Sequence, residues 1–488
     1  MKLGRHLLGY APVKLIAALV AFGNIYVFTR LLSPDQYGRY GLMLAALTLI
    51  HSISLTWVEA AVFRFTGAAA AKGNLPDHYR TAIVSTFQAM IATLLLIGLL
   101  LIIVWPYPEY RWFVPLIALH LPMTTVVKIV FEARRASQQV AHYMLASVGK
   151  LVLGFVAGVL LALFAGLGAL SPIAGLVVAA FVLVLIEGPW LLRQAAGGTS
   201  DPATRRAWLV FGIPTAIAIS LDMLLSSADR FLIAYFMGEA SVGAYTAGYG
   251  VADKTVLMIC AWAALAASPL MLAAYENGGP EAAQKEARGL IRTLLLLGAP
   301  AATGLALVAK PLAEAMIGEP LRAQAIEIIP WIAFAGLLNG ILIHYISESF
   351  QLTKKTRERA LLMLVPVATN ILLNVVLIPA FGLMGAVAAT LLSYAGGIVL
   401  MGWVGGRYLA LPVPLLDIAS ITLACIAMWP ALTVLPELGG WLELLMKACV
   451  GALVYGIVAF ALDTAGARGR LKQILARRTA ASSPSDAP

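Results

Sequence analysis

The chain has 488 residues, of which 61% are hydrophobic and only 12% are charged. A soluble domain carries about 25% charged residues, so this composition excludes a water-soluble globular protein. The net charge of +10 would suggest nucleic-acid binding in a soluble protein. Because apolar segments fill most of the chain, we instead expect the Lys and Arg residues to set the orientation of the protein in the membrane.

Fourteen apolar stretches follow one another from Tyr10 to Asp463, separated by short polar joints. A hydrocarbon layer of about 30 Å needs about 20 helical residues to cross it, which is the length of these stretches. They predict an all-α, polytopic membrane protein with 14 transmembrane helices. The expected spans are 10–30, 39–62, 81–105, 112–133, 140–166, 170–192, 207–236, 242–274, 289–309, 324–349, 359–380, 383–406, 413–435 and 442–463.

Lys and Arg residues are distributed unevenly between the two sets of joints. With an even number of spans, 23 of them lie on the side of the two termini, seven lie on the opposite side, and four lysines lie within spans. Cytoplasmic loops carry an excess of Lys and Arg in membrane proteins. The bias therefore predicts that both termini are cytoplasmic.

A sequence pattern repeats at an offset of 205 residues. The segments 28–40 and 233–245 each contain an apolar helix end, a small acidic turn and a Gly-x-Tyr motif. The repeat predicts two six-helix lobes around a central cavity, formed by helices 1–6 and 7–12 and related by an axis along the membrane normal. The expected parts are a lobe over 1–205, a lobe over 206–410, two extra helices over 411–463 and a basic cytoplasmic tail over 464–488. The tail fits either a helix lying on the anionic leaflet or a solvated basic end.

The joint at 29–41, the run at 228–238 and the number of helices resemble the polysaccharide-transporter branch of the multidrug/oligosaccharidyl-lipid/polysaccharide exporter superfamily. The resemblance covers nearly the whole chain, and the two motifs stand at equivalent joints of both halves. It implies a flippase in the bacterial inner membrane, which moves polyprenyl-pyrophosphate-linked oligosaccharide to the outer leaflet by alternating access for surface polysaccharide assembly. The resemblance does not identify the sugar.

Cationic side chains inside the spans point to the same substrate. A charge in the middle of a span costs about 2.5–3.5 kcal/mol even on the insertion scale, so such groups are expected to face protein or water. Pyrophosphate would satisfy several cations at once, although each of them could instead snorkel or pair with an acid. The cations within spans are Lys14, Lys128, Lys150, Arg230 and Lys254. Of these, Lys14, Lys150, Arg230 and Lys254 are the expected pyrophosphate ligands.

Three carboxylates inside the spans are candidates for coupling an ion such as H⁺ or Na⁺. Asp222 could bind the ion or pair with Lys254. Glu59 could bind it too, although a pair with Arg64, one turn beyond, is the favoured interpretation. Asp253 is the third candidate.

Two tyrosines follow one another at helical spacing in the eighth span. Tyr249 is expected to hold a sugar ring, whereas Tyr245 lies near the outer boundary and is interpreted as part of the aromatic belt. In the span before it, Asp229 and Arg230 could form a local lock to a neighbouring helix.

Two other functions compete with this reading. A cation-coupled multidrug exporter of the same superfamily would need an acidic, aromatic cavity, against which the lysines argue. A membrane polysaccharide polymerase or ligase would need a catalytic outer loop, but the outer joints are short. No phosphate loop, zinc spacing or nucleophile elbow occurs, and the three cysteines lie in apolar stretches without metal-ligand spacing. We therefore expect neither an enzyme nor a cofactor or metal.

Overall fold

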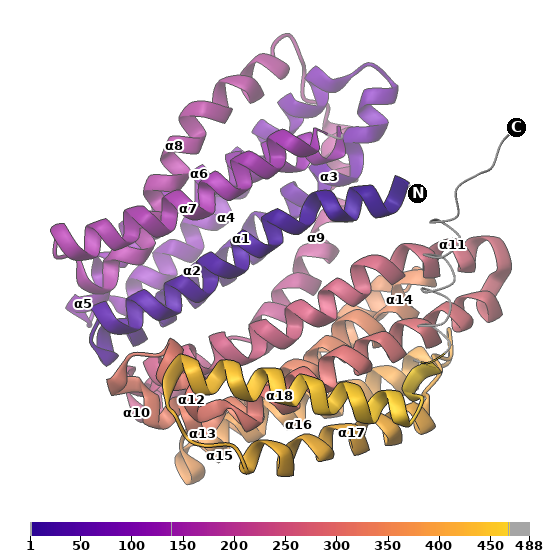
Figure 1. Ribbon diagram of the computed structural model, residues 1–488. Coiled ribbons are helices and arrows are strands. Elements are labelled where there is room, and N and C mark those ends of the chain that lie inside the picture. Colours follow the sequence, from indigo (N-terminus) through magenta and orange to yellow (C-terminus); the bar gives the residue numbers. More distant parts are fainter. Residues whose placement is uncertain (1, 138, 467, 469–488) are drawn as a thin grey trace, which may run out of the picture. The chain divides into compact units, whose positions relative to one another are not determined.

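The computed structural model describes residues 2–137, 139–466 and 468, without the side chains of residues 2–14, 140, 266 and 465. This part of the chain is helical and contains no strand (Figure 1). The helices are α1 (Lys2–Leu31), α2 (Pro34–Ser54), α3 (Thr56–Ala71), α4 (Leu75–Val104), α5 (Pro108–Arg111), α6 (Phe113–Ala136), α7 (Val140–Phe164), η1 (Gly168–Leu170), α8 (Ser171–Gln194), α9 (Pro202–Leu225), α10 (Ala228–Met237), α11 (Glu239–Leu307), α12 (Ala309–Met316), α13 (Glu319–Ile341), η2 (Leu342–Ile346), α14 (Glu348–Leu352), α15 (Thr356–Phe381), α16 (Leu383–Gly405), α17 (Leu415–Thr433), α18 (Gly440–Ala461) and η3 (Thr464–Gly466). The predicted all-α membrane fold is confirmed.

The number of membrane spans differs from a simple count of apolar stretches. Among the described residues, 11 helices are long and apolar enough to cross a membrane, or up to 12 if the bent pair α2 and α3 is one span. The apolar part of α1, Leu15–Leu31, is shorter. Element α11 covers two expected spans, because it consists of two helices joined across a kink at Gly279, where φ is 72° and ψ is −164°. The total of 14 spans stays a prediction.

The chain divides into two compact units. The first unit comprises residues 1–247, 316–324 and 356–393, and the second comprises 248–315, 325–355 and 394–488. The expected lobe boundaries at 205 and 410 stay a prediction.

Small residues allow close helix packing in the first unit, where α6, α7 and α8 lie side by side (Figure 1). A Cβ atom on Gly175 of α8 would lie 2.3 Å from the carbonyl oxygen of Gly154 and 2.5 Å from the backbone nitrogen of Gly158, both on α7. Glycine is therefore required at this crossing, as in other membrane helix pairs that pack through small residues.

The two copies of the repeated motif contact each other within the first unit. A Cβ atom on Gly38 would lie 1.9 Å from the Glu239 carbonyl oxygen, and one on Gly243 would lie 2.5 Å from the Pro34 carbonyl oxygen. Gly38 corresponds to Gly243, and Pro34 corresponds to Glu239, at the offset of 205 residues. The contact is therefore reciprocal, and we call it the joint contact.

An ion pair lies beside the joint contact. The Glu239 carboxylate accepts a hydrogen bond from Arg39 Nε at 2.5 Å and another from the Tyr110 hydroxyl at 2.5 Å. These bonds connect the starts of α2 and α11 with α5.

Ser33 begins α2 with a capping box. The backbone N–H of Gln36 donates to Ser33 Oγ at 3.3 Å, and the backbone N–H of Ser33 donates to Gln36 Oε1 at 3.1 Å. Pro34 stands in the first turn, where its missing N–H leaves no bond unmade.

We expect Ser33→Ala to lower the free energy of unfolding by about 1 kcal/mol, because the first turn of α2 loses its side-chain acceptor. Thermal unfolding in detergent would measure this loss as a lower Tm. Ser420→Ala is the matched control, since the Ser420 hydroxyl bonds the Asp417 carbonyl within α17. An equal Tm for the two variants would contradict the capping role.

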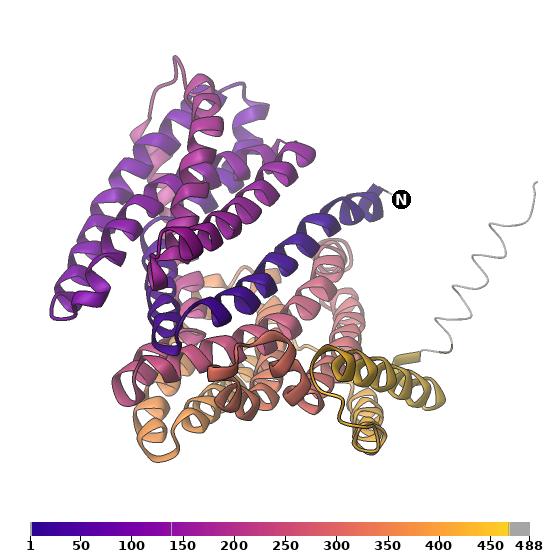
Figure 2. The same ribbon diagram turned by 60° about the vertical axis from the view of Figure 1, so that its left-hand side comes forward.

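Helices α17 and α18, the two extra helices of the sequence analysis, pack against each other in the second unit (Figure 2). Tyr455 of α18 donates a hydrogen bond to the Leu296 carbonyl of α11 at 2.9 Å. Arg292 of α11 pairs with Asp417 of α17 at 2.5 Å. The extra helices are thus fixed to α11 by polar contacts as well as by packing.

Candidate functional site

A bend in the second predicted span brings polar side chains together in the first unit. Helix α2 ends at Ser54, α3 begins at Thr56, and the two helices meet at an angle of 51°. His51 stands in the last turn of α2 and Glu59 in the first turn of α3. The start of a helix favours a negative charge, which suits the position of Glu59.

His51, Glu59 and Lys128 of α6 form a cluster of titratable side chains that we call the proton triad. His51 Nε2 lies 2.8 Å from Glu59 Oε1, and Lys128 Nζ donates to Glu59 Oε2 at 3.2 Å. Lys128 Nζ also lies 2.8 Å from His51 Nε2. The Glu59 side chain is 10% exposed, whereas that of Lys128 is 41% exposed. The interpretation that pairs Glu59 with Arg64 is wrong.

Lys150 of α7 adds a second ammonium group close to the proton triad. Its Nζ donates to the Thr124 hydroxyl of α6. Thr124 stands one turn before Lys128, and His120 stands one turn before Thr124, so the three share one face of α6. A hydroxyl carries no charge, so the bond to Thr124 does not neutralise Lys150, and the two ammonium groups have the one Glu59 carboxylate between them. This face of α6, together with α7, can therefore attract an anion.

The Asp229–Arg230 pair forms a local lock. Tyr245 donates its hydroxyl proton to Asp229 Oδ2 at 2.5 Å, and the Arg230 guanidinium donates to the Ser226 carbonyl at 2.7 Å. Asp229 and Tyr245 are fully buried. The interpretation of Tyr245 as a belt residue is wrong, because its ring is enclosed and its hydroxyl bonds a carboxylate.

Asp222 is held by an ion pair. Its two carboxylate oxygens accept hydrogen bonds from Arg359 of α15 at 3.2 Å and 3.0 Å. The predicted role of Asp222 in ion coupling stays a prediction.

The remaining predicted site residues lie elsewhere. Tyr249 and Asp253 are buried, one turn apart, on the part of α11 that belongs to the second unit, and Lys254 is exposed beside them. Lys14 belongs to α1, but its side chain is outside the described part of the chain. The structure thus brings Lys150 together with Lys128 and the Glu59 carboxylate, and their roles in binding stay predictions.

Another buried ion pair lies at the C-terminal end of α6. Arg134 Nη2 donates to Glu187 Oε2 of α8 at 2.8 Å, and both side chains are less than 10% exposed. His142 Nε2 lies 2.7 Å from the other oxygen of Glu187. The guanidinium of Arg134 also lies over the Trp190 ring, 4.5 Å from its centroid. This network joins α6, α7 and α8.

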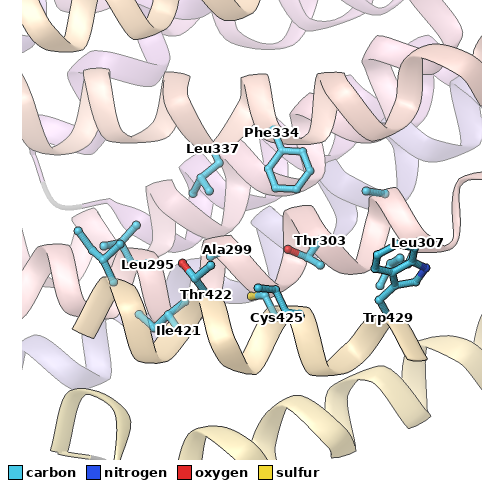
Figure 3. Close-up of a pocket in the computed structure, with 13 residues that line it drawn as sticks. Leu295, Ala299, Thr303, Leu307, Phe334, Leu337, Ile421, Thr422, Cys425 and Trp429 are labelled. Carbon is cyan, nitrogen blue, oxygen red and sulfur yellow. The ribbon is translucent and has the colours of Figure 1, made fainter. Parts of the chain in front are cut away.

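The second unit contains an apolar groove of about 480 Å³ between α11, α13 and α17. Figure 3 shows Ile421, Cys425 and Trp429 on α17 facing residues of α11 such as Ala299. The few polar atoms of its lining include the hydroxyls of two threonines. A hydrocarbon chain fits such a lining better than a sugar does.

The many apolar helices place the chain in the class of multi-pass helical membrane proteins. The family model described as "Polysaccharide biosynthesis protein" matches residues 27–323. The chain is a member of this polysaccharide biosynthesis family. No match is found among curated proteins.

Solved transporters share the fold. The chain is similar to "Lipid II flippase MurJ, inward closed conformation", with 13% identity over 93% of this chain and 98% of that chain and a TM-score of 0.73. It is similar to an inward-facing multidrug resistance MATE family transporter of the MOP superfamily, with 16% identity over 81% and 95% and a TM-score of 0.61. A third similar structure is a MOP superfamily transporter from Pyrococcus furiosus, described with a reversed polarity of its binding pocket, with 14% identity over 82% and 94% and a TM-score of 0.58. These likenesses show a shared fold.

Proposed function

We propose that this protein flips a polyprenyl-pyrophosphate-linked oligosaccharide from the cytoplasmic to the outer leaflet of the bacterial inner membrane, by alternating access and for surface polysaccharide assembly. Its family supports a role with polysaccharides, and its likeness to a lipid flippase supports translocation. Both termini are then cytoplasmic, as the distribution of Lys and Arg predicts.

The observation that carries this proposal is the pair of ammonium groups, Lys128 and Lys150, on α6 and α7. Lys128 is partly exposed and shares one carboxylate with His51, and Lys150 is bonded to a hydroxyl. The local charge is therefore positive, as a pyrophosphate group requires. Lys14, Arg230, Lys254 and Tyr249 stay proposed ligands of the substrate.

The lipid part of the substrate also has a candidate place. A polyprenyl chain is apolar along its length, and the groove beside α17 presents almost only apolar side chains. We assign this groove to the hydrocarbon chain as part of the same proposal.

The membrane potential is the proposed driving force. An anion that leaves a cell with a negative interior gains about 2.3 kcal/mol per charge per 100 mV, so two charges gain about 4.6 kcal/mol. Asp222, Glu59 and Asp253 remain the proposed residues for coupling H⁺ or Na⁺ to the return step.

A cation-coupled multidrug exporter is the second candidate function. Its basis is the likeness to multidrug resistance transporters, together with the carboxylates Glu59 and Asp222 inside the first unit. Such an exporter would bind cationic dyes, whereas the proposed flippase would bind pyrophosphate lipids.

Binding and flipping of a polyprenyl-pyrophosphate oligosaccharide, in detergent and in proteoliposomes, test the proposal. We expect Lys150→Gln to weaken binding about tenfold and its combination with Lys128→Gln about a hundredfold, because each change removes one charged contact. Lys310→Gln is the control, since Lys310 pairs with the exposed Glu437. A negative interior potential should accelerate outward flipping. Binding of a cationic dye without binding of the pyrophosphate lipid would favour the exporter instead.

A further inference from the structure

The proton triad contains a hydrogen-bonding conflict. His51 Nε2 lies 2.8 Å from Glu59 Oε1 and 2.8 Å from Lys128 Nζ. A carboxylate can only accept hydrogen bonds, and an ammonium group can only donate them. One ring nitrogen would have to donate to Glu59 and accept from Lys128 at the same time, which is impossible for a single protonation state.

Two proton arrangements resolve this conflict. When His51 is neutral with its proton on Nδ1, Nε2 accepts from Lys128, and Lys128 also donates to Glu59. When one proton from solution binds to Nε2, the imidazolium donates to Glu59, and Lys128 then faces a second cation. Lys128 loses a partner in the second arrangement, and its 41% exposed side chain is able to turn away.

We infer that His51, Glu59 and Lys128 form a proton-binding switch, in which uptake of one proton at His51 transfers Glu59 from Lys128 to His51 and frees Lys128 for a phosphate group. The inference rests on the proposed function, because it names the group that Lys128 then binds. It makes Glu59 the counter-ion that holds Lys128 while no substrate is bound. Proton uptake and anion binding favour each other, since each stabilises the same arrangement.

The charged groups around the proton triad explain why His51 should bind its proton only when the anion binds. The titratable groups that interact with the proton triad are Glu132 of α6, which pairs with Arg135, His120 of α6 and Lys150 of α7. The other helices packed on α3 and α6 carry His78 of α4, which bonds Thr66, Glu187 of α8, which pairs with Arg134, and Asp222 of α9, which pairs with Arg359. The carboxylates in this set already have cationic partners, whereas Lys150 adds a positive charge. A third cation close to two ammonium groups is unfavourable until an anion compensates it.

Calorimetry of inorganic pyrophosphate binding, carried out at one pH in two buffers with different heats of ionisation, counts the protons taken up. We expect wild-type protein to take up about one proton more per pyrophosphate than His51→Gln or Glu59→Gln, because the protonation of the ligand itself is common to all three. Glu59→Gln should also bind about tenfold more tightly, because Lys128 loses its competing partner. Glu132→Gln is the control, since Glu132 lies on α6 with Lys128 but pairs with Arg135. It should keep the wild-type uptake.

The outcomes separate the switch from the proposed function. Pyrophosphate binding with the same proton uptake in wild type, His51→Gln and Glu59→Gln would overturn the switch and leave the anion site standing. Absence of pyrophosphate binding would reject the anion site. The proton arrangement of the triad is then tested by the tautomer of His51 in the ligand-free protein.

In the ligand-free protein, ¹⁵N-histidine NMR spectra, assigned with His51→Gln, should show a neutral His51 with its proton on Nδ1. In Lys128→Gln the proton should move to Nε2 and face Glu59. The same tautomer in both proteins would overturn the switch.

Discussion

Replacing Glu187 with alanine is expected to lower the free energy of unfolding by about 3–5 kcal/mol, because the change leaves the buried Arg134 without its carboxylate. Thermal and denaturant unfolding in detergent measure this loss. Glu437→Ala is the control, since Glu437 is 69% exposed in its pair with Lys310. Its removal should cost less than about 1 kcal/mol.

A second change to Arg134 makes this prediction specific. Adding Arg134→Met to Glu187→Ala should recover most of the lost stability, because an apolar side chain replaces the unpaired buried charge. If Glu187→Ala and Glu437→Ala unfolded at the same temperature, the buried pair would have no structural importance.

Gly38→Ala and Gly243→Ala are each expected to cost about 3 kcal/mol or more, because their Cβ atoms would overlap backbone carbonyl oxygens across the joint contact. The Tm of each variant in detergent measures the cost. Gly98→Ala in α4 is the control, since no atom lies within 4 Å of its added Cβ, and it should stabilise the helix slightly.

The double variant tests whether the joint contact is one structural unit. Once Gly38→Ala has separated the two helices, Gly243→Ala should add little, so the combined loss should be smaller than the sum of the two single losses. Strict additivity would show that the two glycines belong to independent contacts.

The sequence alone predicts the class of fold, because 20-residue apolar stretches leave a chain few alternatives to membrane helices. It predicts the boundaries less well. The 51° bend between α2 and α3 lies at Leu55, where neither glycine nor proline marks it in the sequence. The segment Gly278–Gly279–Pro280 reads as a joint between two spans, and Gly279 breaks the helical geometry of α11 there.

The residues of the candidate site could be predicted from the sequence better than their partners. The membrane cost of a charge identifies Glu59, Lys128 and Lys150 as unusual residues, but assigning partners needs tertiary structure. Glu59 and Arg64 both belong to α3 and lie about 140° apart around it, so they face different neighbours. The bend before α3 instead brings Glu59 to His51, eight residues earlier. Arg359 begins the expected span 359–380, a position typical of a charge at a helix end, so the sequence does not predict its pair with Asp222.

The joint contact is self-complementary: each copy of the motif supplies one glycine and one carbonyl to the other. Symmetric homodimers are built in the same way, because one surface patch meets its own equivalent. A half-length ancestor with a single motif would have carried both partners of this contact and could have paired with a second copy of itself. Gene duplication followed by fusion would then have placed both copies in one polypeptide, after which each half was free to acquire charges that the other lacks.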